Sequence, residues 1–157
     1  MNVFQLLMQG FSVALTPENL LLCAIGVISG TLVGALPGIG PAGATAILLP
    51  ATFKLGPVGS LIMLAGIYYG TQYGGTITSV LMKIPGESAS VVTMFDGYPL
   101  ARQGKAGLAL GLAAIGSFVG GTLSIIGLML FGPPLADMAL MFGPAEYFSL
   151  MILALSL

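Results

Sequence analysis

A run of residues without a single charge, from Asn19 to Phe53, is too long to cross a membrane as one helix. As a continuous α-helix the run would extend over about 52 Å, whereas the hydrocarbon core of a bilayer is about 30 Å thick and needs about 20 residues. Two prolines and two glycines interrupt the run at residues 37–41, Pro-Gly-Ile-Gly-Pro, where they oppose a regular helix. The sequence therefore predicts a helix that is broken inside the membrane. Such breaks are tolerated where the backbone lines a cavity or is buried in protein.

The composition indicates an integral membrane protein. Of the 157 residues, 57% are hydrophobic and only 6% are charged, against about 25% charged residues in a soluble domain. So few charges do not cover a surface that faces water, and we expect membrane lipid around the chain. The net charge is −1 and the sequence holds no basic patch, so we expect no nucleic-acid partner.

The chain contains no histidine and one cysteine, Cys23. Ser-His and Cys-His nucleophile pairs cannot form, and neither can a zinc site of the usual His and Cys type. No Ser-Lys or paired-Asp arrangement lies within the apolar runs either. We therefore expect that the protein is not an enzyme and that it has no metal site and no cofactor.

The apolar runs predict an all-α fold of polytopic transmembrane helices with broken or re-entrant half-helices, in a single domain over residues 1–157. Thr16, Pro17 and Glu18 supply a capping hydroxyl, a proline at the first helical position and an acid in the first turn, so we expect a helix from Pro17 to about Leu36. Further helices are expected at 42–53, at 55–82, within 88–95 as a re-entrant or short interfacial piece, and at 106–131.

The two ends of the chain are less regular. Residues 1–16 are expected to form either an interfacial helix or part of a first span. Gly132-Pro133-Pro134 is expected to close the helix that begins at 106, and residues 137–145 to form a connector. The last apolar run, residues 147–157, is too short for a span. We expect a truncated last helix and an N-terminal fragment of a longer protein.

Glycines recur every four residues in several predicted helices. They are Gly26, Gly30 and Gly34; Gly66, Gly70 and Gly74; Gly107 and Gly111; and Gly116 and Gly120. Small residues at this spacing make a flat helix face on which two backbones approach closely. We interpret these glycines as packing faces. An alternative applies best to Gly74 and Gly75, which polar residues surround: a glycine there lets the backbone reach a ligand.

Three clusters combine a broken or glycine-rich backbone with polar side chains. The first is the 37–41 break with Gly38, Gly40, Gly43 and Thr45. A helix that restarts near Pro41 presents unpaired N–H groups and the positive end of its dipole, which attract an anion, whereas freed carbonyls on the other side hold a cation. The alternative is a purely structural kink.

The second cluster spans residues 68–79, with Thr71, Gln72 and Thr76 near its centre. Hydroxyl and amide groups at membrane depth are expected to face a cavity or another helix, because unpaired polar groups cost several kcal/mol in hydrocarbon. Hydrogen bonding between helices is the simpler interpretation of this cluster.

The third cluster is a second Pro-Gly break at Pro85-Gly86, followed by Glu87, Ser88, Ser90 and Thr93. The serines are candidates to cap a helix start and to donate to a carboxylate. Glu87 either binds a coupling cation or proton, or lies at the membrane interface beside Lys83. Thr45 and Thr93 follow Pro37 and Pro85 at the same offset, which suggests a site built from paired short helices.

In this order, the three clusters resemble the large membrane subunit of the tripartite tricarboxylate transporters, the TctA-type family. The matching stretches are 34–43 (Gly-Ala-Leu-Pro-Gly-Ile-Gly-Pro-Ala-Gly), 64–75 (Leu-Ala-Gly-Ile-Tyr-Tyr-Gly-Thr-Gln-Tyr-Gly-Gly), 83–90 (Lys-Ile-Pro-Gly-Glu-Ser-Ala-Ser), 96–99 (Asp-Gly-Tyr-Pro) and 116–121 (Gly-Ser-Phe-Val-Gly-Gly). The resemblance covers the chain from about Pro17 onward. Gln72 has no assigned place in the family pattern, so its role stays open.

The resemblance implies a multi-pass subunit of a cation-coupled carboxylate transporter in the bacterial inner membrane. Its substrate would be a small, citrate-like carboxylate, its coupling ion Na⁺ or H⁺, and its partners a small membrane subunit and a periplasmic solute-binding protein. Members are longer, so this chain would hold one half of an inverted repeat. Substrate contacts are then expected from Gly38, Gly40, Gly43, Thr45, Gly86, Ser88, Ser90 and Thr93, and cation contacts from Thr71, Gln72, Gly74, Gly75, Thr76 and Glu87. A membrane scaffold that packs through its glycine stripes without transporting is the alternative.

Overall fold

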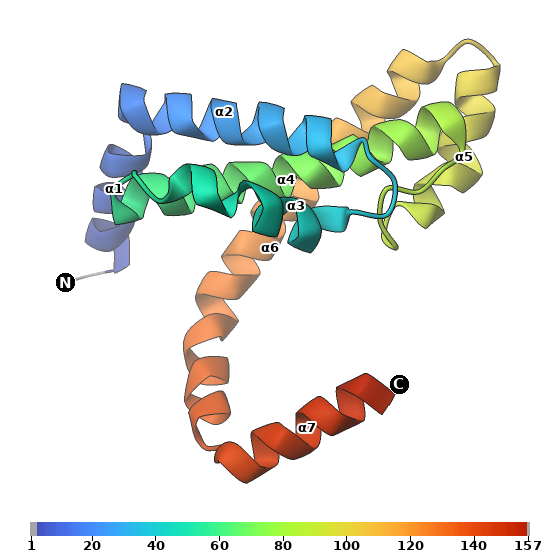
Figure 1. Ribbon diagram of the computed structural model, residues 1–157. Coiled ribbons are helices and arrows are strands. Elements are labelled where there is room, and N and C mark those ends of the chain that lie inside the picture. Colours follow the sequence, from blue (N-terminus) through green and yellow to red (C-terminus); the bar gives the residue numbers. More distant parts are fainter. Residues whose placement is uncertain (1–2, 157) are drawn as a thin grey trace. The chain divides into compact units, whose positions relative to one another are not determined.

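The computed structural model describes residues 3–156, and every regular element in that range is a helix (Figure 1). The elements are α1 (Val3–Ala14), α2 (Pro17–Gly34), α3 (Gly40–Leu48), the 3₁₀ helix η1 (Leu49–Thr52), α4 (Pro57–Met82), α5 (Val91–Arg102), α6 (Ala106–Leu140) and α7 (Pro144–Ser156). The all-α prediction is confirmed. The chain forms two compact units, Met1–Ala114 and Ile115–Leu157, and all three polar clusters lie in the first.

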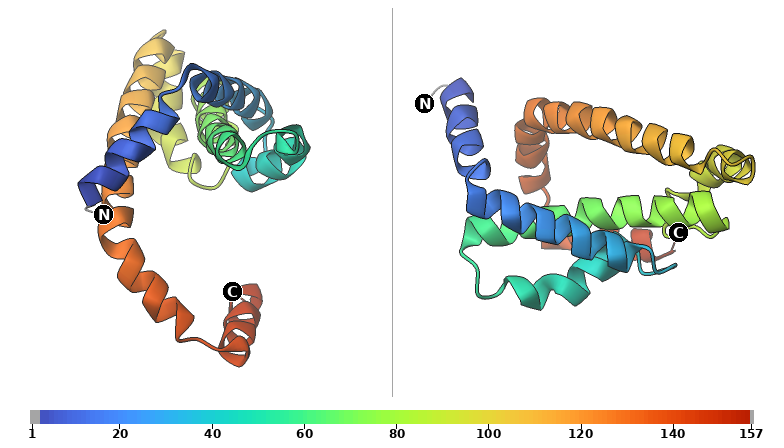
Figure 2. Two further views of the ribbon diagram at one scale, coloured as in Figure 1. Left: turned by 90° about the vertical axis from the view of Figure 1, so that its left-hand side faces the viewer. Right: turned by 90° about the horizontal axis from the view of Figure 1, so that it is seen from above.

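The first unit is built on α2 and α4, which lie side by side along most of α2 (Figures 1 and 2). The two glycine stripes face each other in this contact and are buried. A Cβ on Gly66 would lie 2.7 Å from the carbonyl oxygen of Cys23, and one on Gly30 would lie 2.8 Å from the Cα of Ile67. The packing interpretation is therefore confirmed for the stripes of α2 and α4. At Gly107, Gly111, Gly116 and Gly120, by contrast, an added Cβ meets nothing within 4 Å among the described residues.

The broken helix at 37–41 is present, with boundaries that differ slightly from the prediction. α2 begins at Pro17, as expected, and ends at Gly34 rather than Leu36. Thr16 occupies the N-cap position, but its hydroxyl donates to the Val13 carbonyl at 3.0 Å instead of capping the helix. The piece expected at 42–53 is divided into α3 and η1, because Pro50 has no N–H with which to continue the α-helical ladder.

The second break connects α4 to α5. α4 ends at Met82, and Lys83 takes the left-handed conformation with φ 59°. The helix that was expected within 88–95 begins at Val91 and runs to Arg102, so the prediction is wrong in its boundaries. Pro85 and Gly86 oppose helix formation in the preceding segment. Ser90 holds the turn before α5 by accepting from the Glu87 N–H at 3.2 Å.

The end of α6 also differs from the prediction. The helix continues through Pro133 and Pro134 to Leu140, so neither the predicted closure at 132–134 nor the connector at 137–145 is correct. Proline removes a hydrogen-bond donor, but its fixed φ is compatible with a helix, and here the helix continues past both. α7 follows and has 13 residues, about 20 Å in length, which is less than the hydrocarbon thickness.

Two of the described helices, α2 and α6, are long and apolar enough to cross a membrane by length and composition. α4 is longer than α2, but glycines, tyrosines and hydroxyl residues make up much of its second half. α1 has 12 residues, too few for a span on its own. Many large apolar side chains of the described helices are exposed, as expected of surfaces that contact lipid.

Candidate functional site

The two Pro-Gly breaks, distant in sequence, are in direct contact. The backbone N–H of Gly38 donates to the carbonyl of Gly86 at 3.3 Å. Gly38 and Gly40 have φ values of 86° and 64°, in the left-handed region that glycine adopts without strain. The two glycines thus allow the chain to reverse after α2 and meet the second break.

The polar cluster of α4 packs against the second break through Gly75. A Cβ on Gly75 would lie 3.2 Å from the Cα of Gly86, and one on Gly86 would lie 3.1 Å from the carbonyl oxygen of Gly34. Gly86 is buried between the end of α2 and the middle of α4. All three sequence clusters therefore converge at one place in the first unit.

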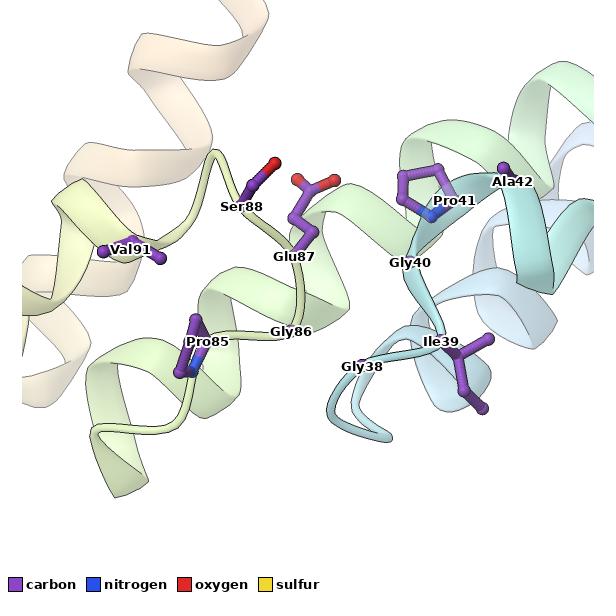
Figure 3. Close-up of a pocket in the computed structure, with 10 residues that line it drawn as sticks. All are labelled: Gly38, Ile39, Gly40, Pro41, Ala42, Pro85, Gly86, Glu87, Ser88 and Val91. Carbon is purple, nitrogen blue, oxygen red and sulfur yellow. The ribbon is translucent and has the colours of Figure 1, made fainter. Parts of the chain in front are cut away.

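A pocket of about 450 Å³ opens where the breaks meet. Figure 3 shows its lining: Gly38, Ile39, Gly40, Pro41 and Ala42 from the first break, and Pro85, Gly86, Glu87, Ser88 and Val91 from the second. The carboxylate of Glu87 lies between the Ser88 hydroxyl and the first turn of α3 in this view. Four predicted substrate residues, Gly38, Gly40, Gly86 and Ser88, thus line one pocket, and Glu87, predicted to contact a cation, lines it with them.

The start of α3 gives this pocket a positive character. Ile39 is the N-cap residue and supplies no side-chain cap, and Pro41 has no N–H. The N–H groups of Gly40 and Ala42, in the first turn, have no carbonyl acceptor four residues earlier in the helix. They and the helix dipole favour a negatively charged group at this wall.

Gln72 contacts Glu87 from α4. With the amide assigned so that its nitrogen faces the carboxylate, Gln72 Nε2 donates to Glu87 Oε2 at 3.0 Å and also contacts Oε1; the opposite assignment would set oxygen against oxygen. Glu87 lies in the connection between α4 and α5, where partial burial raises the pKa of its carboxyl group above the usual value of 4.5. The amide hydrogen bond favours the ionised form and opposes that shift.

Four of the predicted substrate residues lie outside the pocket lining: Gly43, Thr45, Ser90 and Thr93. The Thr45 hydroxyl donates to the Pro41 carbonyl at 2.7 Å. Ser90 is buried and occupies the N-cap position of α5, yet its hydroxyl donates to the Glu87 carbonyl at 2.9 Å. These two hydroxyls hold backbone turns at the edge of the pocket.

The hydroxyls of α4 bond mostly to the carbonyls of their own helix. Thr71 donates to Ile67 at 2.7 Å and also lies 3.1 Å from the Gly30 carbonyl oxygen across the α2 contact. Thr76 donates to the Gln72 carbonyl at 3.2 Å. Gly74 packs against the backbone of α2. Of the residues predicted to contact a cation, the structure brings Gln72 and Glu87 into contact and places Gly75 against Gly86.

Sequence reasoning missed half of the lining. The missed residues are Ile39, Pro41, Ala42, Pro85 and Val91. All are apolar, whereas the residues predicted from the sequence are polar residues and glycines. Ile39, Pro41 and Pro85 lie within the two breaks, and this position is the sequence signal for them.

The fold and the pocket define a helical membrane protein in which two broken segments line one pocket. Residues 20–157 match the tripartite tricarboxylate transporter TctA family, so the chain belongs to that family. It is also 55% identical over 155 residues to an Agrobacterium vitis protein described as "Uncharacterized 52.8 kDa protein in TAR-I ttuC' 3'region". That match covers 99% of this chain and 31% of the relative, so the chain spans about a third of the relative's length. No solved structure matches the chain.

Proposed function

We propose that this chain forms part of the membrane subunit of a cation-coupled tricarboxylate transporter, and that the pocket between the two breaks is one wall of its substrate site. The observation that carries the proposal is the meeting of Gly38 and Gly86 beside the first turn of α3. The family to which the chain belongs makes a carboxylate the expected ligand.

The chemistry of the wall suits a carboxylate. The first turn of α3, with Gly40 and Ala42 in the lining, brings the positive end of a helix dipole to the pocket without a fixed cationic side chain. The exposed Ser88 hydroxyl adds a donor whose direction can adjust. The opposing wall would come from the part of the protein beyond this chain, since transporter sites of this kind lie between two repeats.

The partners and the location follow from the family rather than from the pocket. We propose that a periplasmic solute-binding protein delivers the carboxylate, that a small membrane subunit completes the complex, and that the complex works in the bacterial inner membrane. Na⁺ or H⁺ would move with the substrate and drive alternating access.

The test is uptake by the full-length protein, reconstituted with both partners in proteoliposomes. Labelled di- and tricarboxylates are supplied under an imposed Na⁺ or proton gradient, and Gly38→Ala is compared with the wild type. Gly104→Ala is the matched control, because Gly104 has φ 77°, has open space around it and lies outside the pocket. Both variants place an alanine at a positive φ, 86° at Gly38 and 77° at Gly104.

We expect uptake to fall at least tenfold in Gly38→Ala and to remain near the wild-type rate in Gly104→Ala. Equal uptake in the two variants would contradict the proposal that the pocket forms part of the substrate site. If the wild-type complex moves none of the carboxylates under either gradient, a scaffold that packs through the α2 and α4 stripes becomes the better account.

A further inference from the structure

Gln72 and Glu87 place an uncharged amide against a carboxylate at the edge of the pocket. Gln72 belongs to the middle of α4 and Glu87 to the connection between α4 and α5. With the amide nitrogen assigned to face the carboxylate, Gln72 Nε2 donates to Glu87 Oε2 at 3.0 Å. A hydrogen bond that an N–H donates to a carboxylate favours the charged form. The contact therefore holds a negative charge beside the pocket.

The negative charge of Glu87 disfavours binding of an anion, although the rest of the pocket is suited to an anion. The first turn of α3 attracts an anion, but a carboxylate bound there shares the pocket with Glu87, and two close carboxylates repel each other. Glu87 is the only titratable side chain in the lining. Around it, α4 presents the neutral Gln72, and Lys83 in the same connection lies over the Tyr98 ring, 5.8 Å from its centroid.

We infer that Glu87 is the group whose neutralisation by the coupling cation admits the substrate carboxylate, and that Gln72 is a positioning residue that keeps Glu87 ionised while the pocket is empty. The inference rests on the proposed function and deepens it. A proton neutralises Glu87 by binding to the carboxylate, after which the rotated Gln72 amide accepts from the new O–H through its oxygen. Na⁺ neutralises Glu87 by binding between the carboxylate and the same amide oxygen. In both cases the pocket loses one negative charge.

The transport experiment uses the full complex with Glu87→Gln and Gln72→Leu. Glu18→Gln and Gln103→Leu are matched controls at exposed positions outside the pocket. Exchange of labelled for unlabelled carboxylate and gradient-driven accumulation are both measured over about pH 5 to 8, with and without Na⁺. The pH series at constant Na⁺ and the Na⁺ series at constant pH separate the two cations.

We expect Glu87→Gln to exchange carboxylate without dependence on the cation and to lose accumulation. In a proton-coupled complex Gln72→Leu moves the midpoint of exchange upward by about one pH unit, because loss of the amide donor makes Glu87 easier to protonate. In a Na⁺-coupled complex it raises the half-saturating Na⁺ concentration, because an amide ligand is lost. Unchanged cation dependence in Glu87→Gln would overturn the inference while leaving carboxylate transport intact.

A second measurement tests the contact without any transport. The thermal midpoints of wild type, Gln72→Leu, Glu87→Gln and the double variant are compared in detergent at high and low pH. We expect the two substitutions to be non-additive at high pH and closer to additive when Glu87 is protonated. Additivity at every pH would overturn the role of Gln72. If the wild-type complex shows no uptake, the inference fails together with the proposed function. The comparison of the four thermal midpoints still tests whether Gln72 and Glu87 interact.

Discussion

Gly75 and Gly86 contact each other through their backbones, so that Gly86 has no room for a side chain and Gly75 has very little. A Cβ on Gly75 would lie 3.2 Å from the Cα of Gly86, and one on Gly86 would overlap the Cα of Gly75. This contact seats the second break on α4 and thereby positions Glu87 and Ser88 at the pocket.

Gly86→Ala should therefore lift the connection away from α4. We expect a loss of about 1 to 3 kcal/mol in the free energy of unfolding, the usual cost of overpacking, together with loss of uptake. Thermal unfolding in detergent measures the first effect and the proteoliposome assay the second. Gly107→Ala is the control: that helical glycine has nothing within 4 Å of an added Cβ, so stability should be unchanged or slightly higher.

The contact between α2 and α4 should be equally intolerant of added volume. Gly70→Ala places a Cβ against the backbone of Val27, and the α2 backbone cannot move as a flexible side chain would. We expect a fall in the thermal midpoint and no change in which carboxylates are bound, since Gly70 is outside the pocket. Gly111→Ala in α6 serves as the comparison, and an equal effect there would contradict the packing account.

Substitution of Ser88 should affect substrate binding, whereas substitution of Ser90 should affect the stability of the fold. Ser90 is buried, and its hydroxyl accepts from the Glu87 N–H at 3.2 Å and donates to the Glu87 carbonyl at 2.9 Å. Ser90→Ala should destabilise the protein by about 1 to 3 kcal/mol. Ser88→Ala, at an exposed pocket position, should raise KM for uptake and leave the unfolding curve within about 0.5 kcal/mol of wild type. The reverse pattern would contradict these assignments.

The stability of the protein should depend on pH through Glu87. Burial raises the pKa of Glu87 in the folded state above its usual value of 4.5, so the folded state binds this proton more tightly than the unfolded chain. The stabilisation is fully present at a pH below the pKa that Glu87 has in the unfolded chain. It is lost as the pH rises through the higher pKa that Glu87 has in the folded state. Relative to Glu87→Gln, wild type should lose thermal stability as pH rises from about 4 to 8. A difference in thermal midpoint between wild type and Glu87→Gln that stays the same at every pH would contradict the raised pKa of Glu87.

The sequence was sufficient for the helical class, for the break at 37–41 and for the packing role of the α2 and α4 glycines. Each prediction depends on a local rule. The length of the charge-free runs predicts membrane helices, proline and glycine predict the break, and the four-residue spacing of glycines predicts close helix packing. The meeting of Gly38 with Gly86 was suggested only by a shared offset, because contacts between distant segments depend on the tertiary path of the chain.

Local rules also explain the errors. Pro133 and Pro134 predict a helix end, yet α6 carries both and runs to Leu140. The hydroxyls of Thr71 and Thr76 are expected to face a cavity or a neighbouring helix. Thr71 does lie against a neighbouring helix, since its hydroxyl is 3.1 Å from the Gly30 carbonyl oxygen of α2 and 2.7 Å from that of Ile67. Thr76 instead donates to the Gln72 carbonyl one turn earlier, which satisfies its hydroxyl within a single helix. Polar composition alone does not distinguish these two arrangements.

The glycine contact between α2 and α4 has a consequence for how the protein is made. At each glycine of the two stripes, the backbone atoms nearest to an added Cβ come from residues before Lys83. The pair can therefore close as soon as α4 has been synthesised, without waiting for later helices. We expect this pair of parallel helices to be the first stable intermediate during synthesis, with the second Pro-Gly connection, at residues 85–86, added to a surface that is already formed.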